Sequence, residues 1–244
     1  ITLDWKSLLS NHSKDINQHN ILKTNSETGE KASIFLKNKA VCTQESGYIL
    51  VEGPDAEVFL QGQVTCDVSN VVQGASVNGA HLNPQGKVIF SFLLSKLKKG
   101  LIILDVNKPI LATAMSSLEK YAVFSKVTLS LSENFYSFLI SSKASDDLPK
   151  LTKYSSIQKL SKGIIYSIVP KTLFSKWFDL IKDDITLIHN DTSRYIRINA
   201  GLTDIYPETS SKFIPQVLNY DLNNFISFEK GCYTGQEIVA RTHY

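Results

Sequence analysis

Residues 230–241, near the C-terminal end of the sequence, read Lys230-Gly231-Cys232-Tyr233-Thr234-Gly235-Gln236-Glu237-Ile238-Val239-Ala240-Arg241. Thr234 and Glu237 have the spacing of a capping box, which predicts that a helix begins at this point. Cys232 precedes the cap by two residues, where unpaired backbone N–H groups and the positive end of the helix dipole favour an anion. This position, with Lys230 close by in the sequence, makes Cys232 a candidate functional thiol.

The residues alone leave two interpretations of Cys232 open. A lone cysteine commonly packs as a small buried hydrophobic side chain, and Glu237 then does no more than cap its helix. Gly231 and Gly235, on either side of Cys232, instead allow the backbone of a ligand or a partner to approach closely. The spacing of the segment therefore identifies a site without deciding what the site does.

Upstream of this segment the pattern is that of a mixed α+β fold. A strand at 48–52 and a helix that starts at Pro54 are followed by two strands, 77–82 and 87–94, which flank a predicted turn at 83–86. After a strand at 101–106, Asn107 is predicted to cap a helix. A similar order of elements follows, which indicates two degenerate copies of one α+β unit.

This order predicts four parts along the chain. Residues 1–45 are expected to form an N-terminal arm, and residues 46–126 and 127–201 the first and second α+β subdomains. Residues 202–244 are rich in Pro, Asn, Ser and Thr, so we expect an ordered but irregular segment that wraps the surface and carries the cysteine motif.

Composition and charge exclude several classes of function. The 244 residues include 26 basic and 23 acidic ones, and this net charge of +3 is too balanced to predict direct nucleic-acid binding. The apolar stretches are much shorter than the roughly 20 residues of a membrane span, so no membrane role is expected.

The cysteines and histidines show no clustered ligand spacing, so no metal site formed by this protein alone is expected. The three cysteines, Cys42, Cys66 and Cys232, include no C-x-x-C pair, which favours a reducing compartment over a disulfide framework. The expected location is the cytoplasm, or the mitochondrial matrix if the source is eukaryotic.

The segment 230–241 resembles the signature of the YgfZ family of folate-binding proteins. Further matching segments lie at 59–68, 83–87, 120–127 and 213–216, so that the resemblance covers residues 45 to 244 approximately. It implies a duplicated, mixed α/β folate-binding fold like that of the T-protein of the glycine cleavage system. The C-terminal β-barrel of that fold is not expected within this chain, which reaches Tyr244 directly after the motif.

The resemblance also implies a function and a set of site residues. It implies a folate-binding accessory protein for assembly or repair of iron–sulfur clusters, which supports client enzymes such as tRNA methylthiolases and has no independent catalysis. Cys232 is its functional thiol, supported by Lys230, Gly231, Tyr233, Thr234, Gly235, Gln236, Glu237 and Arg241. The residues nominated to bind tetrahydrofolate or a derivative are Gln63, Asn83, Lys87, Tyr121, Asn199 and Gln216.

Two other classes of function remain open from the sequence. A folate-dependent aminomethyltransferase is disfavoured because residues 87–91 include no aspartate, and because Asn199 stands where the T-protein pattern has glutamate. Loss of these carboxylates removes a proton acceptor and a partner for pterin N–H groups. An RNA-binding regulator of tRNA modification is disfavoured by the balanced charge.

Overall fold

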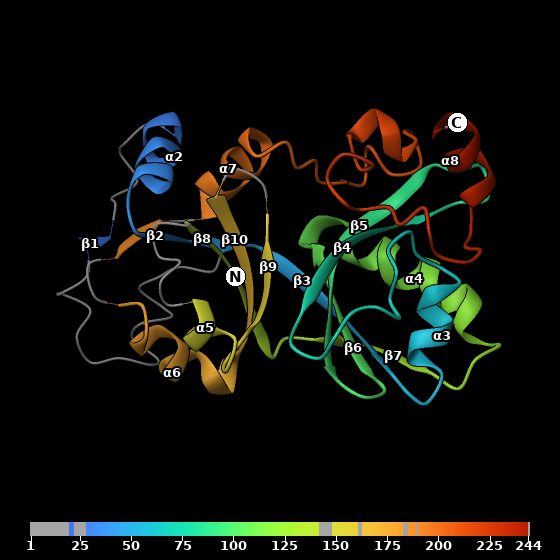
Figure 1. The fold of residues 1–244 in the computed structure, drawn as a ribbon, viewed down its shortest axis with the longest axis horizontal. Helices are drawn as coiled ribbons and strands as arrows, with labels where there is room; N and C mark the ends of the chain where they lie inside the picture. The colour runs from blue at the N-terminus through green and yellow to red at the C-terminus, as the bar shows by residue number, and fades with distance from the viewer. Residues whose placement is uncertain are drawn as a thin grey trace. The chain divides into compact units, whose positions relative to one another are not determined.

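The protein was examined as a computed structural model, which describes residues 20–21, 28–141, 148–160, 163–182, 185–188 and 190–243. The chain divides into two compact units of two segments each (Figure 1). Unit 1 combines residues 1–45 with 134–201, and unit 2 combines residues 46–133 with 202–244. Of the expected N-terminal arm, residues 1–19 and 22–27 lie outside the described residues.

Unit 2 is built on a five-stranded antiparallel sheet in the order β4-β5-β6-β3-β7. Its strands are β3 (Ser46–Glu52), β4 (Ser76–Leu82), β5 (Val88–Lys98), β6 (Leu101–Asn107) and β7 (Thr128–Ser132). The helices of this unit are α3 (Ala56–Gln61), α4 (Leu111–Ala122) and α8 (Gln236–His243), with 3₁₀ turns η2 (Lys108–Ile110) and η7 (Pro215–Leu218). β7, expected in the second subdomain, pairs with β3 and so belongs to this unit.

The turn predicted at 83–86 joins β4 to β5. The N–H of Gly86 donates to the Asn83 carbonyl (2.9 Å), and the Asn83 side-chain oxygen accepts from the N–H of Lys87 (2.9 Å). Gly86 has a φ of +72°, a conformation that side chains with a Cβ rarely adopt. Asn83 and Gly86 therefore have the side-chain acceptor and the backbone freedom that this turn requires.

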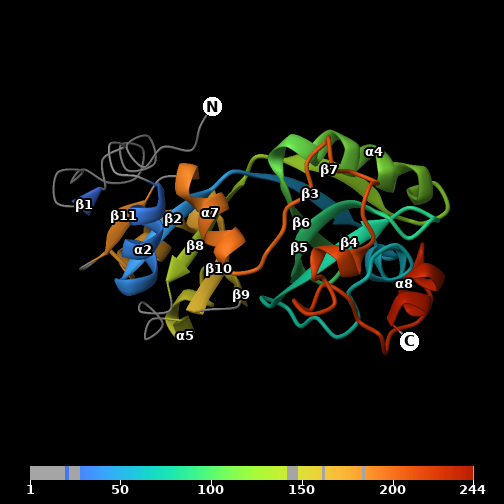
Figure 2. The ribbon, with the colours of Figure 1, turned by 90° about the horizontal axis from the view of Figure 1, so that it is seen from above.

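Helix α4 lies along one face of the unit 2 sheet (Figure 2). Ala114 and Leu118 are fully buried beneath it, together with Ile110 of the preceding turn, as the helical spacing predicts. Asn107 stands at the expected N-cap position, but its side chain makes no capping hydrogen bond. The 3₁₀ turn η2 comes between this residue and α4, and the Asn107 amide donates instead to the carbonyl of Ile205 (3.1 Å).

Unit 1 contains a six-stranded sheet in the order β1-β11-β2-β8-β10-β9. Two pairings, β1 with β11 and β11 with β2, are parallel, and the other pairings are antiparallel. The strands are β1 (Asn20–Ile21), β2 (Ala40–Gln44), β8 (Phe135–Ser141), β9 (Ser156–Lys159), β10 (Ile164–Pro170) and β11 (Thr186–Ile188). The helices are α2 (Thr28–Lys37), α5 (Leu148–Leu151), α6 (Phe174–Asp179) and α7 (Ser193–Asn199), with 3₁₀ turns η5 (Lys171–Leu173) and η6 (Asn190–Thr192).

The core of unit 1 lies between the sheet and α6. Tyr136, Phe138 and Ile140 alternate along β8 and so point to the same face of the sheet, where Trp177 stacks on Phe138 at 4.6 Å between ring centroids. Figure 1 shows α2 and α7 over the opposite face. Lys31 of α2 is buried there and pairs with Asp191 at 2.9 Å.

The order of elements is similar in the two units. Unit 2 follows β3-α3-β4-β5-β6-α4-β7, and unit 1 follows β8-α5-β9-β10-α6-β11, with one strand fewer among the described residues. The predicted duplicated α+β fold is therefore confirmed. Each sheet keeps two edge strands within the described residues and is not a closed barrel. In the part of the chain that the structure describes, no helix is long and apolar enough to cross a membrane.

His81 of β4 is fully buried in unit 2. Its Nδ1 lies 2.7 Å from the carbonyl oxygen of Gln63, and its ring contacts those of Phe90 and Tyr121 with centroids 5.5 and 6.0 Å away. Burial disfavours the charged imidazolium and lowers the pKa of His81 to about 4. His81 is therefore neutral in the folded protein at physiological pH.

This burial predicts an acid-sensitive fold. Above pH 6.5 His81 is neutral in both states, but the unfolded chain takes up its proton as the pH falls from 6.5 to about 4, whereas the folded chain does not. The free energy of unfolding should therefore fall across this interval by up to about 3 kcal/mol. His81→Gln, measured by urea unfolding at pH 7 and 4.5, should show a smaller loss than the parent. Equal losses in both proteins would contradict the assignment.

Candidate functional site

The cysteine motif is fixed to unit 2 by a buried ammonium group. The Nζ of Lys230 donates to three backbone carbonyls, those of Gln61 (2.7 Å), Val64 (2.6 Å) and Cys66 (2.9 Å). An ammonium has three N–H donors and no acceptor, so each of its donors has one partner. Lys230 is only 7% exposed. Its three hydrogen bonds hold together the 61–66 loop, which follows α3.

The charge of Lys230 is balanced by its surroundings. Burial lowers the pKa of Lys230 to about 8, while Cys66 and Asp67 act in the opposite direction, so the ammonium form predominates at neutral pH. The ring of Tyr233 lies 5.0 Å from Nζ and adds a cation–π contact. Tyr233 is itself buried, and burial raises the pKa of its hydroxyl to about 12.

Four further hydrogen bonds join the 61–66 loop to the C-terminal segment. The hydroxyl of Thr65 donates to the carbonyl of Phe225, and the Thr65 carbonyl accepts from the N–H of Ser227 (2.9 Å). The N–H of Thr234 donates to the carbonyl of Gly62, and the Thr234 hydroxyl donates to Oε1 of Gln63, both at 3.3 Å. The two segments therefore form one structural element, although more than 150 residues separate them in the chain.

The motif has two exposed residues between two buried ones. Lys230 and Tyr233 are buried, whereas Gly231 and Cys232 are exposed. A Cβ placed on Gly231 would meet nothing within 4 Å, so the space beside the thiol is open. Lys230 directs none of its donors at Cys232, because the backbone carbonyls of the 61–66 loop take all three. The interpretation of Cys232 as a buried packing residue is wrong.

The capping box does not form as predicted. α8 begins at Gln236, and the Thr234 hydroxyl is bonded to Gln63 instead of to the helix. The reason is Gly235, whose φ of +81° turns the chain between Thr234 and the helix. Glu237 is exposed in the first turn of α8 and Arg241 in the last.

Two glycines lock the start of α8 against the 83–86 turn. A Cβ on Gly235 would lie 2.6 Å from the Asn83 carbonyl oxygen, and a Cβ on Gly86 would lie 2.6 Å from Cβ of Ile238. Both residues also have positive φ values, so any other side chain is excluded by strain as well as by contact. Gln216 adds a hydrogen bond from its amide nitrogen to the carbonyl of Val239 (2.8 Å).

The residues nominated for folate are divided between the two units. Five of them, Gln63, Asn83, Lys87, Tyr121 and Gln216, belong to unit 2, and Asn199 belongs to unit 1. The side chains of three are used to hold the 61–66 loop, the 83–86 turn and α8, as described above. None of the six lines either of the two cavities described in unit 2.

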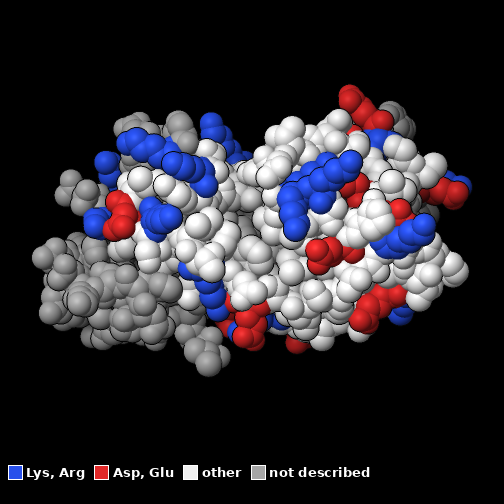
Figure 3. Space-filling view, turned by 90° about the horizontal axis from the view of Figure 1, so that it is seen from below, with Lys and Arg blue, Asp and Glu red and all other residues white. Residues whose placement is uncertain are grey.

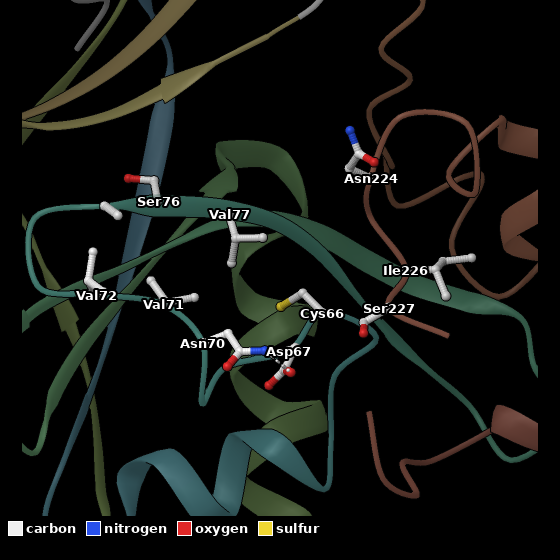
Figure 4. A pocket seen from close by; sticks show the side chains of 11 residues that line it. Cys66, Asp67, Asn70, Val71, Val72, Ser76, Val77, Asn224, Ile226 and Ser227 are labelled. Carbon is white, nitrogen blue, oxygen red and sulfur yellow. Dashed lines mark hydrogen bonds between the residues drawn. The ribbon is translucent and has the colours of Figure 1, made fainter. Parts of the chain in front are cut away.

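These cavities lie elsewhere in unit 2. One, of about 290 Å³, is lined by Cys66, Asp67 and neighbouring residues together with 224–227 (Figure 4). The other, of about 470 Å³, lies against α4 and has a hydroxyl-rich lining that includes Thr113, Ser116 and Ser210. Among the described residues, no three His, Cys, Asp or Glu side chains converge as a metal site. The sequence did not single out Asp67 as a lining residue, although it stands inside a matched segment.

The two sheets define the class to which the fold belongs. The chain is similar to the glycine cleavage system aminomethyltransferase T from Bartonella henselae, with a TM-score of 0.70 over 91% of this chain and 68% of that one, at 15% sequence identity. The fold is therefore the T-protein fold. No protein-family model matches the chain.

Curated relatives narrow this class to one family. The chain is 32% identical over 207 residues to the tRNA-modifying protein YgfZ of Aliivibrio fischeri (strain MJ11), and 32% identical over 218 residues to that of Hamiltonella defensa. An uncharacterized protein of Haemophilus influenzae is 36% identical over 200 residues. These matches cover 80% to 81% of this chain and 64% to 65% of the relatives, so the chain spans a little under two thirds of their length. The chain belongs to the YgfZ family.

Loss of the buried ammonium should destabilise unit 2. Lys230→Met keeps the aliphatic stem but leaves three buried carbonyls without donors, and we expect the free energy of unfolding to fall by on the order of 3 kcal/mol. The matched control is Lys212→Met, because Lys212 is exposed and should change stability little. Urea unfolding of the three proteins measures the difference. Equal stability of both variants would contradict the role of Lys230.

The cysteines should differ sharply in reactivity. Cys232 is exposed, whereas Cys42 and Cys66 are buried and burial raises the pKa of both thiols, that of Cys66 to about 12. A chromogenic disulfide reagent should therefore titrate one thiol in the folded chain and three after denaturation. Cys232→Ser should remove the native reaction completely. A folded Cys232→Ser variant that still reacts within minutes would show that a second cysteine is accessible.

Proposed function

We propose that this protein is an accessory factor of the YgfZ type, which supports tRNA modification through the exposed thiol of Cys232. The single observation that carries the proposal is that the motif presents Cys232 to solvent while the flanking Lys230 and Tyr233 anchor it in the core. The relatives named tRNA-modifying protein YgfZ supply the biological context.

The finer part of the proposal concerns iron–sulfur enzymes. Cysteine thiolates are the usual protein ligands of iron–sulfur clusters. A single exposed thiol can supply one ligand to a cluster that a client protein also holds, and the open space at Gly231 leaves room for the client to approach. On this proposal the cluster is cargo of the client enzyme, such as a tRNA methylthiolase, and the protein has no independent catalysis.

Tetrahydrofolate or a derivative is proposed as a ligand on the strength of the family resemblance. The side chains nominated for it do not fit a preformed folate pocket, because none of them lines either cavity and three already hold the backbone or side chains of unit 2 together. No step in the proposed function therefore passes through folate.

The one-carbon transferase alternative has less support from the residues present. Residues 87–91 include no aspartate to act on the folate, and Asn199 has an amide where the T-protein pattern has a carboxylate. A proton acceptor and a partner for the pterin N–H groups are therefore missing. Direct RNA binding also has little electrostatic basis. On the face shown in Figure 3, basic and acidic side chains are intermixed and separated by uncharged residues.

The proposal is tested in cells that lack their own YgfZ-type protein. The complete natural protein should restore methylthiolated tRNA, and its Cys232→Ala variant should restore less than a tenth of that level. Cys42→Ala is the matched control, because Cys42 is a buried thiol in the sheet of unit 1 and should rescue fully. Mass spectrometry of tRNA nucleosides gives the readout, and immunoblots confirm equal accumulation. Full rescue by Cys232→Ala would overturn the thiol mechanism, and failure of the parent would redirect attention to one-carbon transfer.

A further inference from the structure

The 290 Å³ cavity of unit 2 is lined by both apolar and polar side chains (Figure 4). Its volume is at the lower end of the range for small-molecule sites, about 300 to 1,000 Å³, so only a small group fits. Val71, Val72, Val77 and Ile226 supply apolar side chains, and Cys66 lines it with a thiol that burial keeps protonated, its pKa being raised to about 12. These apolar side chains therefore suit an aliphatic chain.

The lining of the cavity includes one charged side chain. Asp67 is the only charged residue among the described residues that line the cavity. The Ser69 hydroxyl, and then the other hydrogen bonds from Gln61, Ser69 and Asn70, lower the pKa of the Asp67 carboxyl, so it is ionised at neutral pH. A ligand that complements this lining carries a positive charge.

The hydrogen bonds of Asp67 restrict the shape of that cation. Oδ1 of Asp67 already accepts from the Gln61 side chain (3.0 Å), from the Ser69 N–H (3.0 Å) and from the Ser69 hydroxyl. Oδ2 accepts from the side-chain amide of Asn70 (2.7 Å). A guanidinium prefers to bind both carboxylate oxygens at once, whereas an ammonium needs one. The free capacity of Asp67 thus favours an ammonium.

Neighbouring acceptors fit the same cation. Because the Asn70 nitrogen donates to Asp67, the Asn70 amide oxygen is left as an acceptor beside the carboxylate. Ser227 lines the cavity, and its side-chain hydroxyl has no hydrogen-bond partner among the described residues. Lys230 influences Asp67 electrostatically, but its ammonium is buried on the carbonyls of the 61–66 loop and makes no ion pair with Asp67 in the described part of the chain.

We infer that this cavity is a binding site for a primary alkylammonium group, with the aliphatic stem against Val71 and Val72 and the ammonium on Asp67 and Asn70. The same chemistry is found in the lysine side chain of a partner protein and in a free small amine. The inference rests on the cavity and not on the role proposed for Cys232. An experiment that contradicts the amine site therefore leaves the proposed role of Cys232 untouched, and the reverse also holds.

The test is an NMR titration of the ¹⁵N-labelled protein with n-butylammonium, n-butylguanidinium and n-butanol. n-Butylammonium should shift the Ser69 backbone amide and the Asn70 side-chain amide, and bind at least fivefold more tightly than n-butanol. Equal binding of n-butanol, or tighter binding of n-butylguanidinium, would overturn the inference. A parallel titration with Nα-acetyl-lysine methylamide distinguishes the sources: comparable binding supports a protein lysine, and binding of n-butylammonium alone supports a free amine.

Three variants test separately the contribution of the Asp67 charge and that of the apolar lining to binding. Asp67→Asn retains an oxygen acceptor for Ser69 and should weaken n-butylammonium binding at least fivefold, while Glu119→Gln, which removes an exposed carboxylate outside the cavity lining, should leave it unchanged. Val72→Ser removes an apolar wall residue that is 69% exposed and should weaken binding about twofold without unfolding the protein. Equal effects of Asp67→Asn and Glu119→Gln would show a general charge effect and would overturn the site.

Discussion

The buried ammonium of Lys230 is the interaction on which the site depends. An unpaired charge in a protein interior is costly, but here three carbonyls of the 61–66 loop accept all of its donors and the Tyr233 ring adds a further contact. The same three hydrogen bonds therefore satisfy the donors of Lys230 and the carbonyl acceptors of the loop. Unit 2 is thereby closed by a residue from the other end of its chain.

The position of Cys232 follows from this anchor. Lys230 and Tyr233 are buried on either side of an exposed pair, Gly231 and Cys232, so the two anchors hold the thiol at the surface between them. The contact of Gly235 with the 83–86 turn then fixes where α8 starts. The thiol is thereby held at the surface by buried residues on either side of it.

The two units show how one arrangement of elements can serve different purposes. Unit 1 places aromatic side chains between its sheet and α6, and the ion pair of buried Lys31 with exposed Asp191 joins α2 to the chain before α7. Unit 2 uses the corresponding helix, α4, to cover its sheet and adds the C-terminal segment, which supplies the motif. The duplicated order therefore accounts for the fold, while the segment outside the duplication carries the cysteine motif.

The sequence by itself determined the α+β class, the repeated order of elements, the 83–86 turn and the location of the motif, because these depend on local periodicity and on turn residues close together in the chain. It did not determine that Lys230 faces inward, that Thr234 bonds to Gln63 and not to its own helix, or that β7 pairs with β3. Those features depend on partners from 80 to more than 160 residues away, and only the tertiary structure brings these partners within hydrogen-bonding distance. The same is true of the Asp67 cavity, whose lining residues come from both chain segments of unit 2.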